Sequence, residues 1–219
     1  MQAVPPTVKI EKPEEPETFE NKERHFEFCG HRLQITQHLK TLGIPAVIWP
    51  SGLALCRYFD KVRMDFSGKK IIELGSGTGL VGILATLLGG EVTLTDLPKV
   101  LHQVEDNVLK NVPSALGKRA QVCALEWGKD EGMFPSDYDV VLGSDLIYHP
   151  RHFQSLIDTL LHVSSPHTII YFSSNISANM GGRSFHQEIV PKYFNSEILD
   201  EITAKEIRIF KLTKKYDTN

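Results

Sequence analysis

The segment Lys70–Gly79 reads KIIELGSGTG, and it decides how the chain is expected to fold. Its first half, Lys70–Leu74, is a short apolar run of the kind that forms a buried strand. Its second half is a glycine loop of the form G-x-G-x-G, and the almost wholly apolar stretch behind it predicts a helix over Gly79–Leu88. Strand, glycine turn and helix in this order predict a cofactor loop, because glycine lets the backbone approach a ligand closely.

Strands and helices alternate on the carboxyl side of this loop. The predicted strands are Glu91–Thr95, Ala120–Leu125, Tyr138–Gly143 and His167–Ser173, and the predicted helices are Leu97–Asn111, Arg151–Val163 and Ser184–Val190. Two final strands, Glu197–Ile202 and Glu206–Leu212, close the pattern. The alternation predicts an α/β domain in which helices cover both faces of a mostly parallel sheet.

Three further segments are predicted on the amino side of the loop. Alternating residues on both sides of Gly30-His31 predict a β-hairpin over His25–Thr36, and Pro50–Val62 reads as a helix with proline in its first turn. Residues 1–23 hold four prolines and many glutamates, so we expect a flexible acidic tail in front of one domain over residues 24–219.

At the other end of the chain, residues 214–219 are expected to fray.

Composition excludes several classes of protein. The formal net charge of -3 gives no sign of direct nucleic-acid binding. Three widely spaced cysteines without C-x-x-C, and nine histidines without a ligand pattern, predict neither a disulfide scaffold nor a metal site. No long apolar run or signal peptide is recognised, so we expect a cytoplasmic protein without membrane contact, and a monomer.

Two carboxylates near the loop predict which cofactor it binds. The third glycine comes one residue earlier than in a dinucleotide loop, and Glu73 stands two residues before Gly75. A carboxylate disfavours a pyrophosphate but can anchor an ammonium group, which favours S-adenosylmethionine over a nicotinamide cofactor. Asp96 ends the next predicted strand, where an acid binds ribose hydroxyls in this architecture. Capping of the following helix is the other role open to Asp96.

Two tryptophans are candidates for covering the cofactor. Trp127 follows the third predicted strand, where its ring could pack on adenine, and Trp49 precedes the first long helix, where it could close over the site. Packing in the core is an equally good interpretation of each tryptophan from sequence alone.

Four motifs together resemble a known family. They are the glycine loop, Thr95-Asp96-Leu97-Pro98, Leu125-x-Trp127-Gly128 and Asp145-Leu146-Ile147-Tyr148. From about Phe26 to the carboxyl-terminal strands, the chain resembles the methyltransferase-like 21 family of seven-strand protein-lysine methyltransferases. Stretches such as Cys29-Gly30-His31 and Val81-Gly82-Ile83-Leu84 are most similar to the branch that methylates elongation factor 1A.

The resemblance implies a fold and a set of site residues. The fold is an α/β, Rossmann-like seven-stranded (class I) methyltransferase fold with an added N-terminal β-hairpin. The resemblance implies that S-adenosylmethionine is contacted by Trp49, Gly75, Ser76, Gly77, Asp96, Trp127 and Ser144, and it places Asp145 and Tyr148 at the entrance for the substrate lysine. The chain departs from many members at Ser76 and Ser144, where they have alanine, and in the Pro50-Ser51-Gly52 that follows Trp49.

The expected reaction is in-line transfer of a methyl group from S-adenosylmethionine to a neutral lysine amine, with elongation factor 1A as the expected protein partner. Asp145 would favour the positive charge that develops on the amine, and Tyr148 would orient it. A structural role at the start of the next helix in sequence, near His149-Pro150, remains an alternative for Asp145. Methylation of another protein lysine, as on a chaperone, and a non-catalytic scaffold remain alternative functions.

Overall fold

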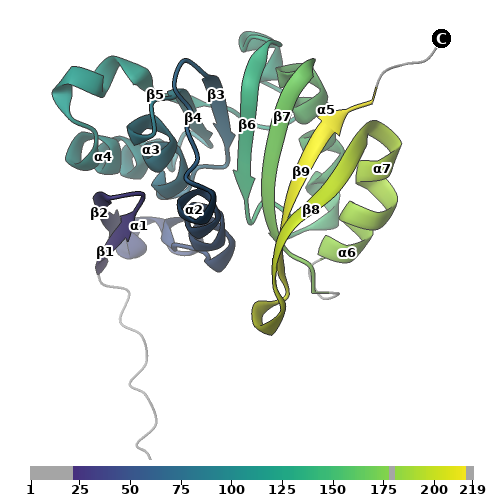
Figure 1. The fold of residues 1–219 in the computed structure, drawn as a ribbon, viewed down its shortest axis with the longest axis horizontal. Coiled ribbons are helices and arrows are strands. Elements are labelled where there is room, and N and C mark those ends of the chain that lie inside the picture. The colour runs from purple at the N-terminus through teal and green to yellow at the C-terminus, as the bar shows by residue number, and fades with distance from the viewer. Residues whose placement is uncertain (1–21, 178–180, 216–219) are drawn as a thin grey trace, which may run out of the picture.

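The computed structural model of the chain describes residues 22–177 and 181–215. A seven-stranded sheet of order β5-β4-β3-β6-β7-β9-β8 forms its centre, and β9 runs antiparallel to both of its neighbours (Figure 1). The strands are β3 (Lys70–Leu74), β4 (Glu91–Asp96), β5 (Ala120–Ala124), β6 (Tyr138–Ser144), β7 (Ser164–Asn175), β8 (Phe194–Ile202) and β9 (Ile207–Lys214). A separate antiparallel hairpin precedes them, formed by β1 (Lys22–Phe28) and β2 (His31–Gln37).

Helices cover both faces of the sheet (Figure 1). On one face lie α2 (Pro50–Val62), α3 (Leu80–Leu87) and α4 (Leu101–Asn111), after the short α1 (Leu39–Leu42). On the other face lie α5 (Phe153–Val163), α6 (Gly182–Ser184) and α7 (Val190–Tyr193). Strand β3 serves both layers, because Ile71 packs in the core under α2–α4 while Ile72 packs in the core under α5. Glu73 shares the Ile71 face, since side chains alternate along a strand.

The register of the parallel strands brings the expected site together. Leu74 pairs with Thr95 of β4 and with Gly143 of β6. The residues that follow these three, Gly75, Asp96 and Ser144, therefore leave adjacent strands at the same edge of the sheet. The strand order reverses between β3 and β6, and such a switch point is where ligands bind in open α/β sheets.

The predicted elements agree with the structure except at some boundaries. Strand β3 and helix α2 have the predicted bounds. Helix α4 begins at Leu101 rather than Leu97, because the Asp96 carboxylate accepts the Leu97 N–H at 2.7 Å and a turn from Leu97 to Val100 precedes the helix. The helix predicted over residues 184–190 is interrupted by a π-helical turn at Phe185–Ile189.

The two chain ends were only partly tested. Residues 1–21 of the expected tail and residues 216–219 of the expected frayed end lie outside the described residues. The tail was predicted to reach residue 23, but Lys22 and Glu23 already belong to β1. The hairpin therefore begins two residues before the predicted domain boundary.

Three amide side chains on α4 attach the hairpin to the domain. Gln103, Asn107 and Asn111, which we call the amide ladder, face the free edge of β2. Asn107 Oδ1 accepts the Thr36 N–H and Asn107 Nδ2 donates to the Thr36 carbonyl, both at 2.9 Å. Asn111 makes the same pair of bonds with Gln34. The ladder thus satisfies backbone groups that an edge strand would otherwise leave open.

Within the described parts of the chain, no helix has the length and apolar character needed to cross a membrane.

Candidate active site

The glycine loop, residues 75–79, forms the floor of the site. Gly75, Gly77 and Gly79 have φ values of 60°, 56° and 78°, a region that side chains with a Cβ adopt at a cost. A Cβ on Gly75 would lie 2.6 Å from Leu146 Cδ2 and 3.4 Å from the Trp127 ring. Glycine at position 75 is therefore required both by backbone conformation and by packing.

Glu73 is a buried carboxylic acid beside this loop. Its side chain is only 2% exposed, and Oε2 accepts the Gly82 N–H of α3 at 3.1 Å. A Cβ at Gly82 would overlap this oxygen, so glycine makes the room for it. Burial raises the pKa of Glu73 to about 8, against the opposing effects of the nearby Ser76 side chain and of the hydrogen bond from the Gly82 N–H. None of the groups that set this pKa in the described part of the chain is positively charged.

Asp96 ends β4 and is bonded to the loop. Its carboxylate accepts the Gly77 N–H and the Leu97 N–H, each at 2.7 Å. Burial raises the pKa of Asp96, and these two amide bonds oppose the rise. The capping alternative for Asp96 is thus partly confirmed, because its carboxylate binds the first amide of the turn before α4 rather than an amide of the helix itself. The same carboxylate also holds the glycine loop at this edge of the sheet.

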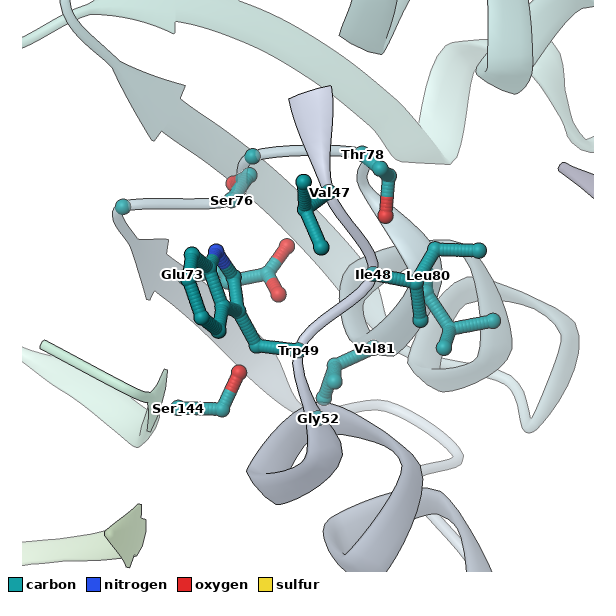
Figure 2. Close-up of a pocket in the computed structure, with 12 residues that line it drawn as sticks. Val47, Ile48, Trp49, Gly52, Glu73, Ser76, Thr78, Leu80, Val81 and Ser144 are labelled. Atoms are coloured by element: carbon teal, nitrogen blue, oxygen red, sulfur yellow. The ribbon is translucent and has the colours of Figure 1, made fainter. Parts of the chain in front are cut away.

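A cleft that is partly open to solvent lies above the loop, and the space between the atoms around it, open solvent included, is about 340 Å³. It is lined by Val47, Ile48, Trp49, Gly52, Glu73, Gly75, Ser76, Gly77, Thr78, Leu80, Val81 and Ser144. Figure 2 shows the Trp49 ring lying across the space between the start of α2 and the glycine loop. Six of the expected cofactor residues line this cavity. Asp96 and Trp127 do not, although Asp96 binds Gly77 and Trp127 packs beside Gly75.

Asp145 connects the end of β6 to the start of α2. Its Oδ1 accepts the Ser51 hydroxyl at 2.6 Å, and its Oδ2 accepts the Ser51 N–H at 2.8 Å. The carboxylate therefore occupies the amino end of α2, where a helix favours negative charge. Its backbone has φ of +55°, an uncommon conformation for a non-glycine residue, and its N–H donates to the Ser173 carbonyl. Burial raises the pKa of Asp145.

Tyr148 stands at the open side of the same region. It is 49% exposed, and its ring centroid lies 5.6 Å from that of His152. The pKa of Tyr148 is raised by burial and then by the negative charge of Asp96. Trp49 is 42% exposed. Trp49 lines the cavity, whereas Tyr148 and Asp145 do not; Tyr148 is linked to the site through the charge of Asp96.

The structure shows three contributors that the sequence interpretation missed. Ser51 holds Asp145, Leu146 packs on Gly75, and Gln103 Nε2 donates to the Gly77 carbonyl at 3.0 Å. For Gln103 a signal was present, because polar amides recur every four residues on a helix whose neighbours are apolar. For Ser51 none was present, since 94 residues separate it from Asp145.

Known proteins match this chain over most of its length. A family model described as lysine methyltransferase matches residues 27–191. EEF1A lysine methyltransferase 3 of Xenopus tropicalis is 48% identical over 194 residues, which cover 88% of this chain and 86% of the relative. Protein N-lysine methyltransferase METTL21A of Danio rerio is 36% identical, with 86% of each chain covered.

A solved structure matches the fold. The 16S rRNA methyltransferase RsmC of T. thermophilus, in complex with AdoMet and guanosine, aligns with a TM-score of 0.65 at 15% identity. The alignment covers 94% of this chain and 53% of RsmC, and it confirms the predicted class I methyltransferase architecture with its seven-stranded sheet. Together with the match of the family model and the identity to two curated relatives, it leads to one conclusion: this chain belongs to the lysine methyltransferase family.

Proposed function

We propose that this protein transfers a methyl group from S-adenosylmethionine to a lysine side chain of elongation factor 1A in the cytoplasm. The substrate rests on the relative from Xenopus tropicalis, whose name specifies EEF1A and which is 48% identical to this chain. The observation that carries the enzymatic part is the buried Glu73 carboxyl group beside a glycine-lined cavity at the switch point of the sheet.

The residues present fit this cofactor. Glu73 is buried without a cationic partner among the groups that set its pKa, and the ammonium group of the methionine moiety would supply one. Gly75 and Gly77 leave the cavity floor without side chains, and Trp49 and Ser144 line its walls. Asp96, at the end of β4, would accept ribose hydroxyls, and Trp127, beside Gly75, would contact adenine. When bound, S-adenosylmethionine supplies a methyl group activated by a sulfonium sulfur.

The protein must present the lysine as a neutral amine. A free lysine has a pKa of about 10.4, so holding it neutral at pH 7 costs roughly 4–5 kcal/mol. The half-exposed rings of Trp49 and Tyr148 would desolvate the ammonium and lower its pKa. Asp145 would then favour the positive charge that develops during transfer. Because Ser51 already donates two hydrogen bonds to Asp145, its charge is partly satisfied and holds the protonated lysine less strongly.

Purified protein, labelled S-adenosylmethionine and purified elongation factor 1A test this function directly. We expect label on a lysine of the factor, located by mass spectrometry, and a lower kcat without loss of cofactor affinity in Tyr148→Phe. Tyr193→Phe, a partly buried tyrosine of the α7 layer, is the matched control. If the label appears on another protein when whole extract is used, that protein replaces elongation factor 1A as the proposed substrate. If the protein binds the cofactor but transfers no methyl group, it acts as a non-catalytic scaffold. If it has no affinity for the cofactor, the proposal that it is a methyltransferase is wrong.

A further inference from the structure

Two histidines and an aspartate from distant parts of the sequence meet where the hairpin joins α4. His38 follows β2, and His102 and Asp106 lie one turn apart on α4. Asp106 Oδ2 lies 3.3 Å from His38 Nε2 and 3.7 Å from His102 Nε2. One ligand atom from each of the three residues lies within 4.8 Å of the other two.

We propose that His38, His102 and Asp106 form a binding site for a divalent transition metal ion, zinc above all. Zinc takes imidazole nitrogen and carboxylate oxygen at about 2.0–2.2 Å, so neighbouring ligands of a tetrahedral ion stand about 3.4 Å apart. The Asp106–His38 distance of 3.3 Å matches that spacing, the Asp106–His102 distance of 3.7 Å is slightly longer, and the ligand atoms of the two histidines lie within 4.8 Å of each other. His102, whose side chain is 78% exposed, is free to rotate and complete the geometry.

The donor set selects zinc over the hard cations. Calcium and magnesium prefer oxygen ligands, whereas two imidazoles and one carboxylate are a common set at zinc sites that keep a fourth position open. The set is also partly preorganised. The His38 side chain is 17% exposed and its backbone N–H donates to Gln103 Oε1 at 2.6 Å, so its position does not depend on an ion.

A metal ion here would act on the glycine loop through one residue. Gln103, which holds the His38 backbone, also donates from Nε2 to the Gly77 carbonyl. An ion shared by His38 and α4 would therefore tighten the junction from which Gln103 reaches the loop. With water in its fourth position, the ion would act as a clamp between the hairpin and the glycine-loop half of the domain, and the proposal does not depend on the methyl-transfer reaction.

Zinc binding to the untagged full chain tests the site. After treatment with a chelator, the protein is titrated with zinc by calorimetry and with cobalt(II) by visible absorption. We expect one ion per chain, a higher melting temperature with zinc, and at least a ~10-fold weaker affinity in His102→Ala and Asp106→Asn. His102→Ala is suited to the test because the side chain is exposed and alanine favours helix.

His25→Ala is the matched control, because His25 also contacts a carboxylate, Glu23, at 3.1 Å, but is not part of a three-ligand group in the described residues. Its zinc affinity should equal that of the unmodified chain. Affinity that persists in His102→Ala would mean that other histidines or cysteines hold the ion, and it overturns the site. Absence of binding to the unmodified chain does so as well.

Discussion

At the scale of single residues, Glu73 has the most unusual environment in the site. An ordinary glutamate titrates at about 4.5, whereas burial places the pKa of Glu73 at about 8. Ionising it at pH 7 in the free protein is therefore unfavourable, and the carboxyl group is mostly protonated. A cofactor with an ammonium group reverses this preference, because the opposite charge favours the ionised acid. Binding of such a cofactor must then release a proton.

Cofactor affinity is predicted to depend on pH through Glu73. Below pH 8 each bound ammonium displaces one proton, so the affinity for S-adenosylmethionine should rise with pH, by up to ~10-fold per unit, and level off above pH 8. Calorimetry in buffers of different ionisation enthalpy counts the released protons. Glu73→Gln should bind more weakly and lose this pH dependence.

A ligand without the amino acid part provides the control for this prediction. Methylthioadenosine lacks the ammonium group, so its affinity should be similar in the unmodified chain and in Glu73→Gln. An equal loss of affinity for both ligands would show that the substitution damages the cavity in general. If the affinity for S-adenosylmethionine is constant between pH 6 and 8, Glu73 does not bind the ammonium group of the cofactor.

Asp145 shows where residue-level prediction from sequence ends. Its place at the end of β6 followed from the strand pattern, and an N-cap role was one of the two interpretations. The helix that it was expected to cap was the next one in sequence. The structure places its carboxylate at the start of α2 instead, 94 residues away. Sequence periodicity orders elements along the chain, but it carries no information on which helix end faces which strand end.

At the scale of elements, α2 offers a way to separate the structural and catalytic roles of Asp145. Ser51→Ala removes the hydroxyl donor but keeps the carboxylate, so it should cost about 1 kcal/mol of stability and leave most of the turnover. Asp145→Asn keeps an acceptor for the Ser51 N–H but removes the charge. It should reduce kcat about 100-fold at nearly unchanged cofactor affinity.

Urea unfolding and methyl-transfer kinetics on both variants measure these two effects. If Asp145 only caps α2, the two variants will lose activity in proportion to their loss of stability. The transfer role is then withdrawn and the cap remains.

Helix α4 carries a second prediction at this scale. Asn107 is fully buried, and its side chain makes two bonds to Thr36 and one to the Thr78 carbonyl of the glycine loop. Asn107→Ala removes three hydrogen bonds and leaves their partners unpaired, so it should destabilise the fold by about 3 kcal/mol. It should also weaken cofactor binding, because the loop loses a contact.

Asn111→Ala is the matched control for α4. Asn111 binds Gln34 in β2 through the same pair of bonds, and its side chain makes no described contact with the loop. Hydrogen exchange should therefore quicken in β2 for both variants, whereas cofactor affinity should fall only in Asn107→Ala. A matching fall of affinity in both variants would mean that the hairpin as a whole, rather than the direct bond to the loop, supports the site.

The boundaries of α4 also show why elements are easier to predict than their ends. The apolar spacing of the helix was visible in sequence, and so was its last residue, Asn111. Its start was placed at Leu97, since Asp96 followed by an early proline resembles a cap. The structure shows that Asp96 does bond the next amide, but it closes a turn that ends at Val100 before the helix begins. Capping chemistry was identified correctly, and the element being capped was not.

At the scale of the whole molecule, the sheet was predictable because each strand carries its own signal. Buried strands such as Lys70–Leu74 are short apolar runs, and right-handed crossovers then restrict how they can assemble. The insertion of β9 between β7 and β8 was not predictable from these signals, because a terminal strand pair can join a sheet in more than one order. The attachment of the hairpin was missed for a similar reason, since it depends on side chains of α4.

Removal of residues 1–21 tests the domain boundary. The hairpin begins at Lys22, so a chain that starts at residue 22 keeps β1, the amide ladder and the whole sheet. Its melting temperature and its affinity for S-adenosylmethionine should equal those of the full chain, by differential scanning calorimetry and isothermal titration. A lower melting temperature would mean that residues 1–21, which are predicted to be a tail from their proline and glutamate content, contribute to the folded domain.

Helix geometry limits how many successive residues of a strand edge the amide ladder can bind. Four residues of helix advance about 6.0 Å, and two residues of antiparallel strand advance about 6.8 Å. The two repeats differ by about 0.8 Å per step. This offset is small enough over two steps for residues 103, 107 and 111 to bind residues 38, 36 and 34. One more step would bring the accumulated offset to about 2.4 Å, too far for a hydrogen bond. The next positions in the four-residue repeat, Lys99 and Ala115, lie outside α4, and neither has an amide side chain.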